Sequence, residues 1–358
     1  MSNPLALAIA SIGLAALPSA GQSSLPRMPD GPPDLQGTYD LATITPLERL
    51  PGDPPFLTKE KAEALQRAEM ARRAKDNLPS KADRPAPPVG GDTSQPRSFF
   101  EILERAGGGA VGGYNRFWLN QGTQFTVVDG QIRTSIVVDP PDGHVPPYNA
   151  AARKRLAAAR ATPTSDQREN NDPNAEPPGA FDNPEQRPLG ERCLLGFGST
   201  SGPPALPDYF YNDLHQIVQT PDSIMILSEM VHDARIVRMN AQHLPRTIRR
   251  WMGDSVGHWE GDTLVVDTTN FNDKTRFRGS TENLHVVERF TRIDARTLLY
   301  RFTVEDPETW DRPWTGEYTW PATDKPIYEY ACHEGNYALG DILRGARAQE
   351  AKARGGDR

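Results

Sequence analysis

The sequence predicts a mainly β protein: an antiparallel β-barrel of the calycin type, with short peripheral helices and long loops. From Asp208 to about Tyr330, apolar and polar residues alternate at period two over about ten short segments. Gly, Asp and Pro turns separate these segments at regular spacing, and few stretches have helical periodicity. Closing the sheet would pair its edge strands, which favours a barrel with an internal cavity over the alternative, a β-sandwich.

Residues 1–21 are predicted to be a signal peptide. The apolar run at 5–17 is shorter than a membrane-spanning helix, and Pro18-Ser19-Ala20-Gly21 supplies small residues for cleavage. An unstructured tail is the alternative. No later run is long and apolar enough for a membrane helix, so we expect a periplasmic or secreted protein without a membrane span.

The rest of the chain divides into three parts. Residues 22–109 form an N-terminal arm, with one helix from Lys59 to about Asn77 behind the capping residue Thr58, and then a Pro-rich linker at 79–96. Residues 110–345 form a single β-rich domain, which includes a short helix from Asn149 to Arg160. Residues 346–358 are predicted to be a disordered tail.

Strands are predicted in pairs around recognisable turns. Asp129-Gly130 is a strong two-residue hairpin signal between 125–128 and 131–138. The other expected strands are 216–219 and 223–230 around Pro221-Asp222, 264–267 after Glu260-Gly261-Asp262, 286–292 and 297–304 around Asp294-Ala295-Arg296, and finally 315–320 and 327–331.

The two cysteines and the net charge narrow the possibilities further. The chain has two cysteines, Cys193 and Cys332, so one long-range disulfide is expected in an oxidising compartment. The alternative is two buried free thiols. The net charge of −7 is mild and argues against nucleic acid as a partner.

Three segments carry a resemblance to known sequences. They are RTSIVVDPPDG from Arg133, WEGDTLVVDTTNF from Trp259, and YEYACHEGNYA from Tyr328. Over roughly residues 110–345 the chain resembles a large family of exported bacterial proteins whose activity is uncharacterised. The resemblance implies export and common descent, and it implies no activity, cofactor or catalytic residue.

A carboxylate is expected on the apolar face of the hairpin 284–306. If the turn is centred on Ala295, Glu288 and Arg292 share a face with apolar and aromatic residues. A carboxylate in such surroundings must be paired, or it takes up a proton. Glu288 and Arg292 therefore form either a structural ion pair or a site that binds and processes a polar group.

Histidines give the second set of candidates. His215 is expected on the face of Ile217 and Ile226, as a satisfied core histidine or as a general base. By the same alternation, His232 is expected on the same face as His215. Metal-binding motifs are absent from the sequence, although His215, His232 and His285 could still converge. A disulfide would also bring His333-Glu334 close to Glu191-Arg192. These four residues would then form either a functional site or a hydrogen-bonded clasp that closes one end of the barrel.

These observations predict an exported, cofactor-independent acid–base enzyme of lyase, isomerase or hydrolase type, acting on a small hydrophobic or aromatic molecule. The alternative is a periplasmic carrier that binds an apolar ligand without turnover. The predicted catalytic residues are Glu288, His215 and His232, and the predicted substrate-binding residues are Arg292, Arg133, Tyr114, Tyr211, Tyr300 and Phe302.

Overall fold

A computed structural model of the chain describes residues 25–76, 120, 122–161, 181–196, 202–207, 211–275 and 277–355. The predicted signal peptide, the Pro-rich linker and Tyr114 lie outside the described residues. Among the described residues, no helix is both long enough and apolar enough to cross a membrane.

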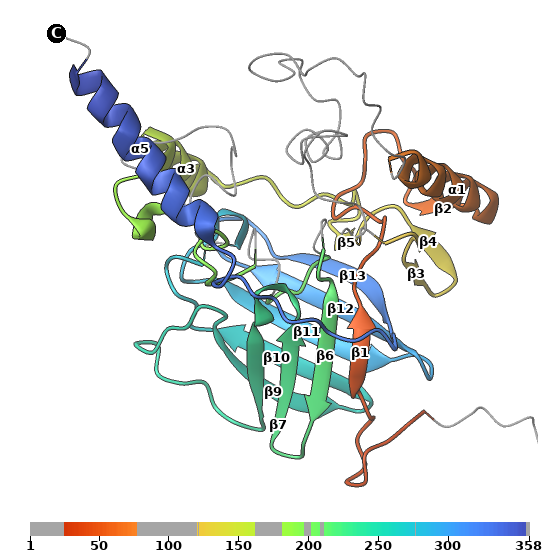
Figure 1. The fold of residues 1–358 in the computed structure, drawn as a ribbon. Coiled ribbons are helices and arrows are strands. Elements are labelled where there is room, and N and C mark those ends of the chain that lie inside the picture. The colour runs from red at the N-terminus through yellow and green to blue at the C-terminus, as the bar shows by residue number, and fades with distance from the viewer. Residues whose placement is uncertain are drawn as a thin grey trace, which may run out of the picture.

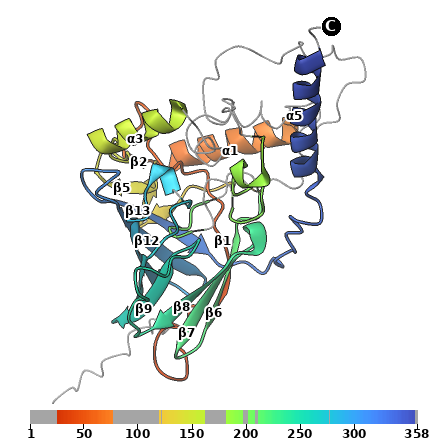
Figure 2. The ribbon, with the colours of Figure 1, turned by 90° about the vertical axis from the view of Figure 1, so that its left-hand side faces the viewer.

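One large sheet of ten strands dominates the described residues, which confirms the mainly β prediction. Its order is β1-β6-β7-β8-β9-β10-β11-β12-β13-β5. The strands are β1 (Gly37–Asp40), β5 (Val137–Asp139), β6 (Leu214–Gln219), β7 (Ser223–Ser228), β8 (Ala234–Met239), β9 (Asp254–Glu260), β10 (Thr263–Thr269), β11 (His285–Arg292), β12 (Thr297–Glu305) and β13 (Trp314–Pro321). The sheet curls strongly, so that β1, β6 and β7 lie in front of β11 and β12 (Figure 1 and Figure 2).

The prediction of a closed, fully antiparallel barrel was wrong. The end strands β1 and β5 do not pair with each other, so the sheet is an open half-barrel. An isolated bridge from Tyr39 to Ala322 and a hydrogen bond from the Thr323 amide to the Thr38 carbonyl (2.8 Å) cover the edge of β1 instead. The pair β8–β9 is parallel, which makes the sheet mixed.

A second, three-stranded sheet contains β2 (Phe56–Leu57), β4 (Gln131–Arg133) and β3 (Val127–Val128). The hairpin around Asp129-Gly130 is therefore confirmed. The single strand predicted over 131–138 is instead divided between the two sheets, as β4 and β5. The backbone between them turns to donate hydrogen bonds from Ile136 and Val137 to the Pro46 and Leu47 carbonyls, both at 2.9 Å.

Three α-helices lie within the described residues: α1 (Lys59–Asp76), α3 (Ala150–Ala161) and α5 (Tyr337–Gly355). The first two match their predicted ranges closely. The segment 346–355, predicted as part of a disordered tail, belongs to α5, which projects from the sheet (Figure 1). Its Ala, Arg, Glu and Lys residues are good helix formers, and Asn336 caps it by accepting from the Leu339 amide at 3.3 Å.

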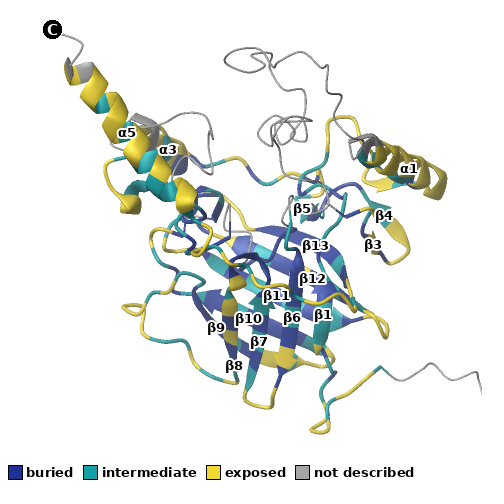
Figure 3. Cartoon of the chain, viewed as in Figure 1, coloured by how far each residue is buried: buried dark blue, intermediate teal, exposed yellow. Residues whose placement is uncertain are grey.

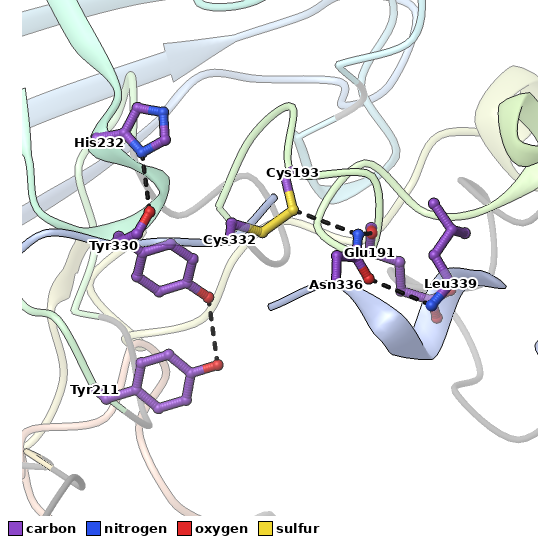
Figure 4. Close-up of a disulfide and its surroundings, with 8 residues drawn as sticks. All are labelled: Glu191, Cys193, Tyr211, His232, Tyr330, Cys332, Asn336 and Leu339. Carbon is purple, nitrogen blue, oxygen red and sulfur yellow. Dashed lines mark hydrogen bonds between the residues drawn. A yellow bond between two sulfur atoms is a disulfide. The ribbon is translucent and has the colours of Figure 1, made fainter. Parts of the chain in front are cut away.

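Residues 322–336, here called the C-terminal strap, join β13 to α5. The strand predicted at 327–331 was wrong, because this part of the strap has no sheet pairing. Side chains hold it: the Tyr328 amide donates to Glu229 Oε1 at 2.7 Å, and Tyr330 stacks on Tyr211 with ring centroids 6.2 Å apart. Near its C-terminal end the strap forms the Cys193–Cys332 disulfide, with Cα atoms 5.8 Å apart, which confirms the predicted pairing (Figure 4).

The curled sheet has a concave face that holds the core and a convex face that is partly open. Along β11 and β12 buried residues alternate with more exposed ones (Figure 3). Val286 pairs with Val304 and Arg292 with Leu298, which confirms the register centred on Ala295. Glu288 and Arg292 therefore lie on the concave face, as predicted.

Candidate functional site

Glu288 lies at the centre of a polar cluster inside the concave face. Arg235, from β8, donates to both of its carboxylate oxygens, one bond being 2.9 Å long. The hydroxyl of Tyr300 donates to Glu288 Oε1 at 2.8 Å. The side chains of Glu288 and Arg235 are 0% and 5% exposed. Burial, and then the charge of Glu288, raise the pKa of Tyr300 well above its ordinary value.

The structural ion pair between Glu288 and Arg292, one of the two alternatives that the sequence left open, does not form. Arg292 instead donates to the Asp34 carbonyl at 2.5 Å and to the Ala295 carbonyl and the Tyr39 hydroxyl, both at 2.9 Å. Residues four apart on one strand share a face but are separated along it, and Arg235 reaches Glu288 from across the curl. Arg292 fastens the N-terminal segment to the sheet, and Arg235 neutralises the buried carboxylate.

His215 lies in the same core, as the predicted register of the β6–β7 hairpin requires. Its ring lies 5.5 Å from that of Trp320, which lies 4.6 Å from Tyr300. Residues 202–207 are buried, and within this segment the Ala205 amide donates to the Tyr300 hydroxyl at 2.9 Å while the Tyr318 hydroxyl donates to the Ala205 carbonyl at 3.0 Å. The predicted site residues Glu288, His215, Tyr300 and Phe302 are all 0% exposed, so bulk solvent does not reach them.

The other predicted residues lie apart from this cluster. Arg133 pairs with Glu317 at 2.7 Å on the convex side, where the small sheet contacts β13. His232 is exposed, with Nδ1 3.2 Å from the Tyr330 carbonyl (Figure 4). Tyr211 packs on the strap. His232 and Tyr211 therefore both hold the strap at Tyr330, and Arg133 holds the small sheet to β13.

Near the disulfide, the arrangement supports a clasp. Asn336 Nδ2 donates to the Glu191 carbonyl at 2.7 Å and lies 3.5 Å from Cys193 Sγ (Figure 4). His333 and Glu334 are exposed. A disulfide between cysteines 139 residues apart is typical of proteins that fold outside the cytoplasm.

A different set of ionisable groups meets on the convex face, and we call it the convex relay. It runs through Asp254 on β9, His243 in the loop after β8, Asp267 on β10 and His285 on β11. His243 places Nδ1 3.1 Å from Asp254 Oδ2 and Nε2 2.8 Å from Asp267 Oδ1. His285 Nε2 lies 2.9 Å from Asp267 Oδ2, so one carboxylate holds two imidazoles.

The relay is partly open to solvent, and its contacts shift the pKa values of His285, Asp267 and Asp254. The side chains of His243, Asp267 and His285 are 29%, 35% and 34% exposed. The hydrogen bond to Asp267 raises the pKa of His285, against the opposing effect of burial. Burial would raise the pKa of Asp267, but hydrogen bonds and positive charge from His285 and His243 outweigh it and lower that pKa. Part-exposed groups with shifted pKa values are a common mark of functional sites.

Asp254 anchors one end of the relay. It is 1% exposed and accepts from the Leu244 amide at 2.9 Å and from Arg238 Nη2 at 2.9 Å. Burial opposes its ionisation, yet these bonds and the one with His243 lower its pKa. At the other end, His285 Nδ1 lies 3.6 Å from Glu305 Oε2, beyond hydrogen-bonding distance.

Sequence reasoning missed most of this relay. As a candidate site residue, His285 was considered only as one of three histidines that could converge. His243 lies in a loop without periodicity, and Asp267 follows the apolar run Leu264-Val265-Val266, which indicates a buried strand rather than a site. A usable signal was present. Asp254 and Asp267 become diagonal neighbours on one face of the β9–β10 hairpin, since Asp254 pairs with Thr269 and Asp267 with Val256.

The three histidines considered for a metal do not converge, since His215 lies in the concave core and His285 on the convex face. In the part of the chain that the structure describes, no group of three or more His, Cys, Asp or Glu side chains could hold a metal ion. Comparison with family models, curated proteins and solved structures found no match.

Proposed function

We propose that the protein is an exported, cofactor-independent acid–base enzyme whose proton-transferring pair is His285 with Asp267. The observation that carries the proposal is the shared carboxylate: Asp267 lies 2.9 Å from Nε2 of a part-exposed His285, while Nδ1 faces the Glu305 carboxylate at the longer distance of 3.6 Å. The disulfide and the predicted signal peptide support export, to the periplasm or beyond.

The chemistry follows from which ring nitrogen is held. With its Nε2 hydrogen donated to Asp267, a neutral His285 presents the Nδ1 lone pair to a solute at the surface. Nδ1 can then take a proton, and the negative charge of Asp267 stabilises the imidazolium that forms. Asp254 and Glu305 add negative charge nearby, which favours a neutral or cationic substrate over an anionic one.

The hydrophobic or aromatic nature of the substrate stays a prediction from the sequence. Of the aromatic residues named for binding it, Tyr300 and Phe302 belong to the concave core, on the opposite face of the sheet from His285. Glu288 is a weaker candidate for the base than His285, because Arg235 and Tyr300 already use both of its oxygens.

A general-base probe tests the proposal: the Kemp elimination of 5-nitrobenzisoxazole. The base removes the C3 proton, the N–O bond breaks, the phenolate oxygen keeps the electron pair, and the imidazolium returns its proton to water. We expect the wild-type rate to rise as pH passes the raised pKa of His285, and His285→Gln to lose at least about tenfold.

His258→Gln is the matched control, because His258 lies on the same face and also has a carboxylate neighbour, Glu260, at 3.2 Å. It should keep the wild-type rate. A His285→Gln protein that folds normally and retains the full rate excludes His285 as the base.

The second candidate is the carrier, and one observation favours it. The indole N–H groups of Trp310, Trp314 and Trp320 are buried and, within the described part of the chain, have no hydrogen-bond acceptor. A flat ligand bearing a carbonyl could supply one. Because these rings are at most 2% exposed, the sheet would have to open for binding. Saturable quenching of tryptophan fluorescence by fluorenone, and weaker quenching by fluorene, would support this function; equal non-saturable quenching would exclude it.

A further inference from the structure

The loop that carries His243 exists because β8 and β9 are parallel. After Met239 the chain must return to the other end of the sheet before β9 begins at Asp254. Residues 240–253, here called the crossover loop, make this return without a helix. Because His243 bonds to Asp254 and Asp267, the loop lies against the convex face.

Beyond Asn240, whose amide donates to the Gly257 carbonyl at 2.7 Å, the crossover loop is fastened at two places. At the first anchor, the Gln242 carbonyl accepts from Arg238 at 3.0 Å, and the Leu244 carbonyl accepts from Asn270 Nδ2 at 2.9 Å. The Leu244 amide donates to Asp254 Oδ2 at 2.9 Å. At the second anchor, the Arg250 amide donates to the Asn270 carbonyl at 3.0 Å. Residues 245–248, between the anchors, are exposed.

His243 is the side chain through which the loop itself reaches both β9 and β10 at the first anchor. Each of its ring nitrogens faces a carboxylate oxygen. Only the imidazolium can donate both hydrogen bonds. A neutral ring carries one N–H, and the lone pair of its other nitrogen would face a negatively charged oxygen. The proton is therefore part of the fastening.

We propose that His243 is a proton-operated latch of the crossover loop. Protonated, it fastens the first anchor to Asp254 and Asp267. When the proton leaves, residues 241–248 loosen and the surface around Asp267 and His285 opens. The latch operates on the loop whether or not His285 transfers protons to a substrate.

Several charged side chains lie around the latch on the convex face. Arg238 on β8 pairs with Asp254, Asp267 lies against His243, and Glu305 lies next to His285. Further along the same face of β9 and β11 lie His258, Glu260 and Arg289, of which Arg289 pairs with Glu260. The latch therefore lies in a surface where the two histidines stand among both carboxylates and guanidinium groups.

Hydrogen exchange of the Leu244 amide, followed by NMR in the full chain and corrected for the intrinsic pH dependence, tests the latch. Between about pH 5 and pH 8, protection should fall by at least about tenfold in the wild type. In His243→Gln the step should vanish, and in the matched control His258→Gln it should stay. Constant wild-type protection, or a step that persists in His243→Gln, would overturn the proposal.

A measurement on the wild type alone keeps the test decisive if His243→Gln does not fold. The ring resonances of His243 should titrate with the same midpoint as the protection of the Leu244 amide. Two separate midpoints would show that another group releases the loop, and the proposal would fail.

Discussion

The two faces of the half-barrel contain the same kinds of ionisable group in opposite surroundings. On the concave face, Glu288 is sealed between Arg235 and Tyr300 with no exposed surface. On the convex face, Asp267 holds His243 and His285 with a third of its own side chain exposed. Successive strand residues point to opposite faces, so Glu288 in the buried ion pair and His285 in the part-exposed one lie only three residues apart on β11.

The two faces differ in how much it costs to remove one charged side chain from an ion pair. Removing a partner from the concave cluster leaves a charge in a region that water does not reach, and this is costly. Removing a partner from the convex relay leaves a group that water and salt can screen. The concave cluster therefore fixes the fold, and the convex relay is free to respond to pH.

The largest effect is expected at the centre of the concave cluster. Glu288→Gln leaves Arg235 charged and buried without a counter-ion, so the free energy of unfolding should fall by about 3–5 kcal/mol. Urea denaturation measures it. The matched control is Glu305→Gln, which removes an exposed carboxylate on the convex side and should change the free energy little.

The double variant Arg235→Met with Glu288→Leu sharpens the same comparison. It removes both charges and keeps similar volumes, so it should recover much of the stability that Glu288→Gln loses. If Glu288→Gln is as stable as the wild type, the carboxylate is not needed to balance Arg235, and the contrast between the faces is wrong.

Packing gives the next effect. A Cβ added at Gly316 would lie 2.2 Å from Cζ of Phe302, so Gly316→Ala should cost about 1–3 kcal/mol through displacement of the ring. Gly335→Ala is the control, because its nearest neighbour would be 3.6 Å away. Adding Phe302→Leu should reduce the cost at Gly316, and an unchanged stability of Gly316→Ala would show that the concave core is loosely filled.

The concave face was more predictable than the convex one, for a physical reason. Period-two alternation and the turn at Ala295 determine which β11 residues face inward, so the sequence alone places Glu288 and Arg292 on that face. The sequence does not reveal the partner of Glu288, because Arg235 is 53 residues away and meets it only when the sheet curls. The relay was harder still to predict, since His243 sits in a loop whose path depends on the parallel pair β8–β9.

The closed barrel was predicted because unpaired sheet edges need protection. In the structure the C-terminal strap protects the edge of β1 instead. The strap covers β1 with the Thr323 bond and a Lys325–Asp40 ion pair at 2.8 Å, so closure is unnecessary. The alternation in Tyr328-Glu329-Tyr330 resembled a strand. It instead places Tyr330 against Tyr211 while the Tyr328 amide bonds to Glu229.

The convex relay predicts a pH-dependent stability difference. The pKa of His285 is raised in the folded state, so its contribution is present below its ordinary pKa and is lost as pH rises through the folded value. His285→Gln should therefore be less stable than the wild type by about 0.5–1 kcal/mol near pH 5.5, after allowance for solvent screening. Above about pH 8 the two should converge. Urea denaturation at both pH values measures the gap, and a constant gap would contradict the assignment.

The smallest effect is expected at His258, which differs from His285 mainly in exposure and in the number of carboxylates it meets. Its side chain and that of Glu260 are 50% and 48% exposed, and Glu260 already pairs with Arg289. His258→Gln should leave the urea midpoint unchanged at both pH values, because water screens an exposed ion pair of this kind. If it instead reproduced the pH dependence of His285→Gln, the position on the face would matter more than the shared carboxylate. The reason for assigning function to Asp267 would then disappear.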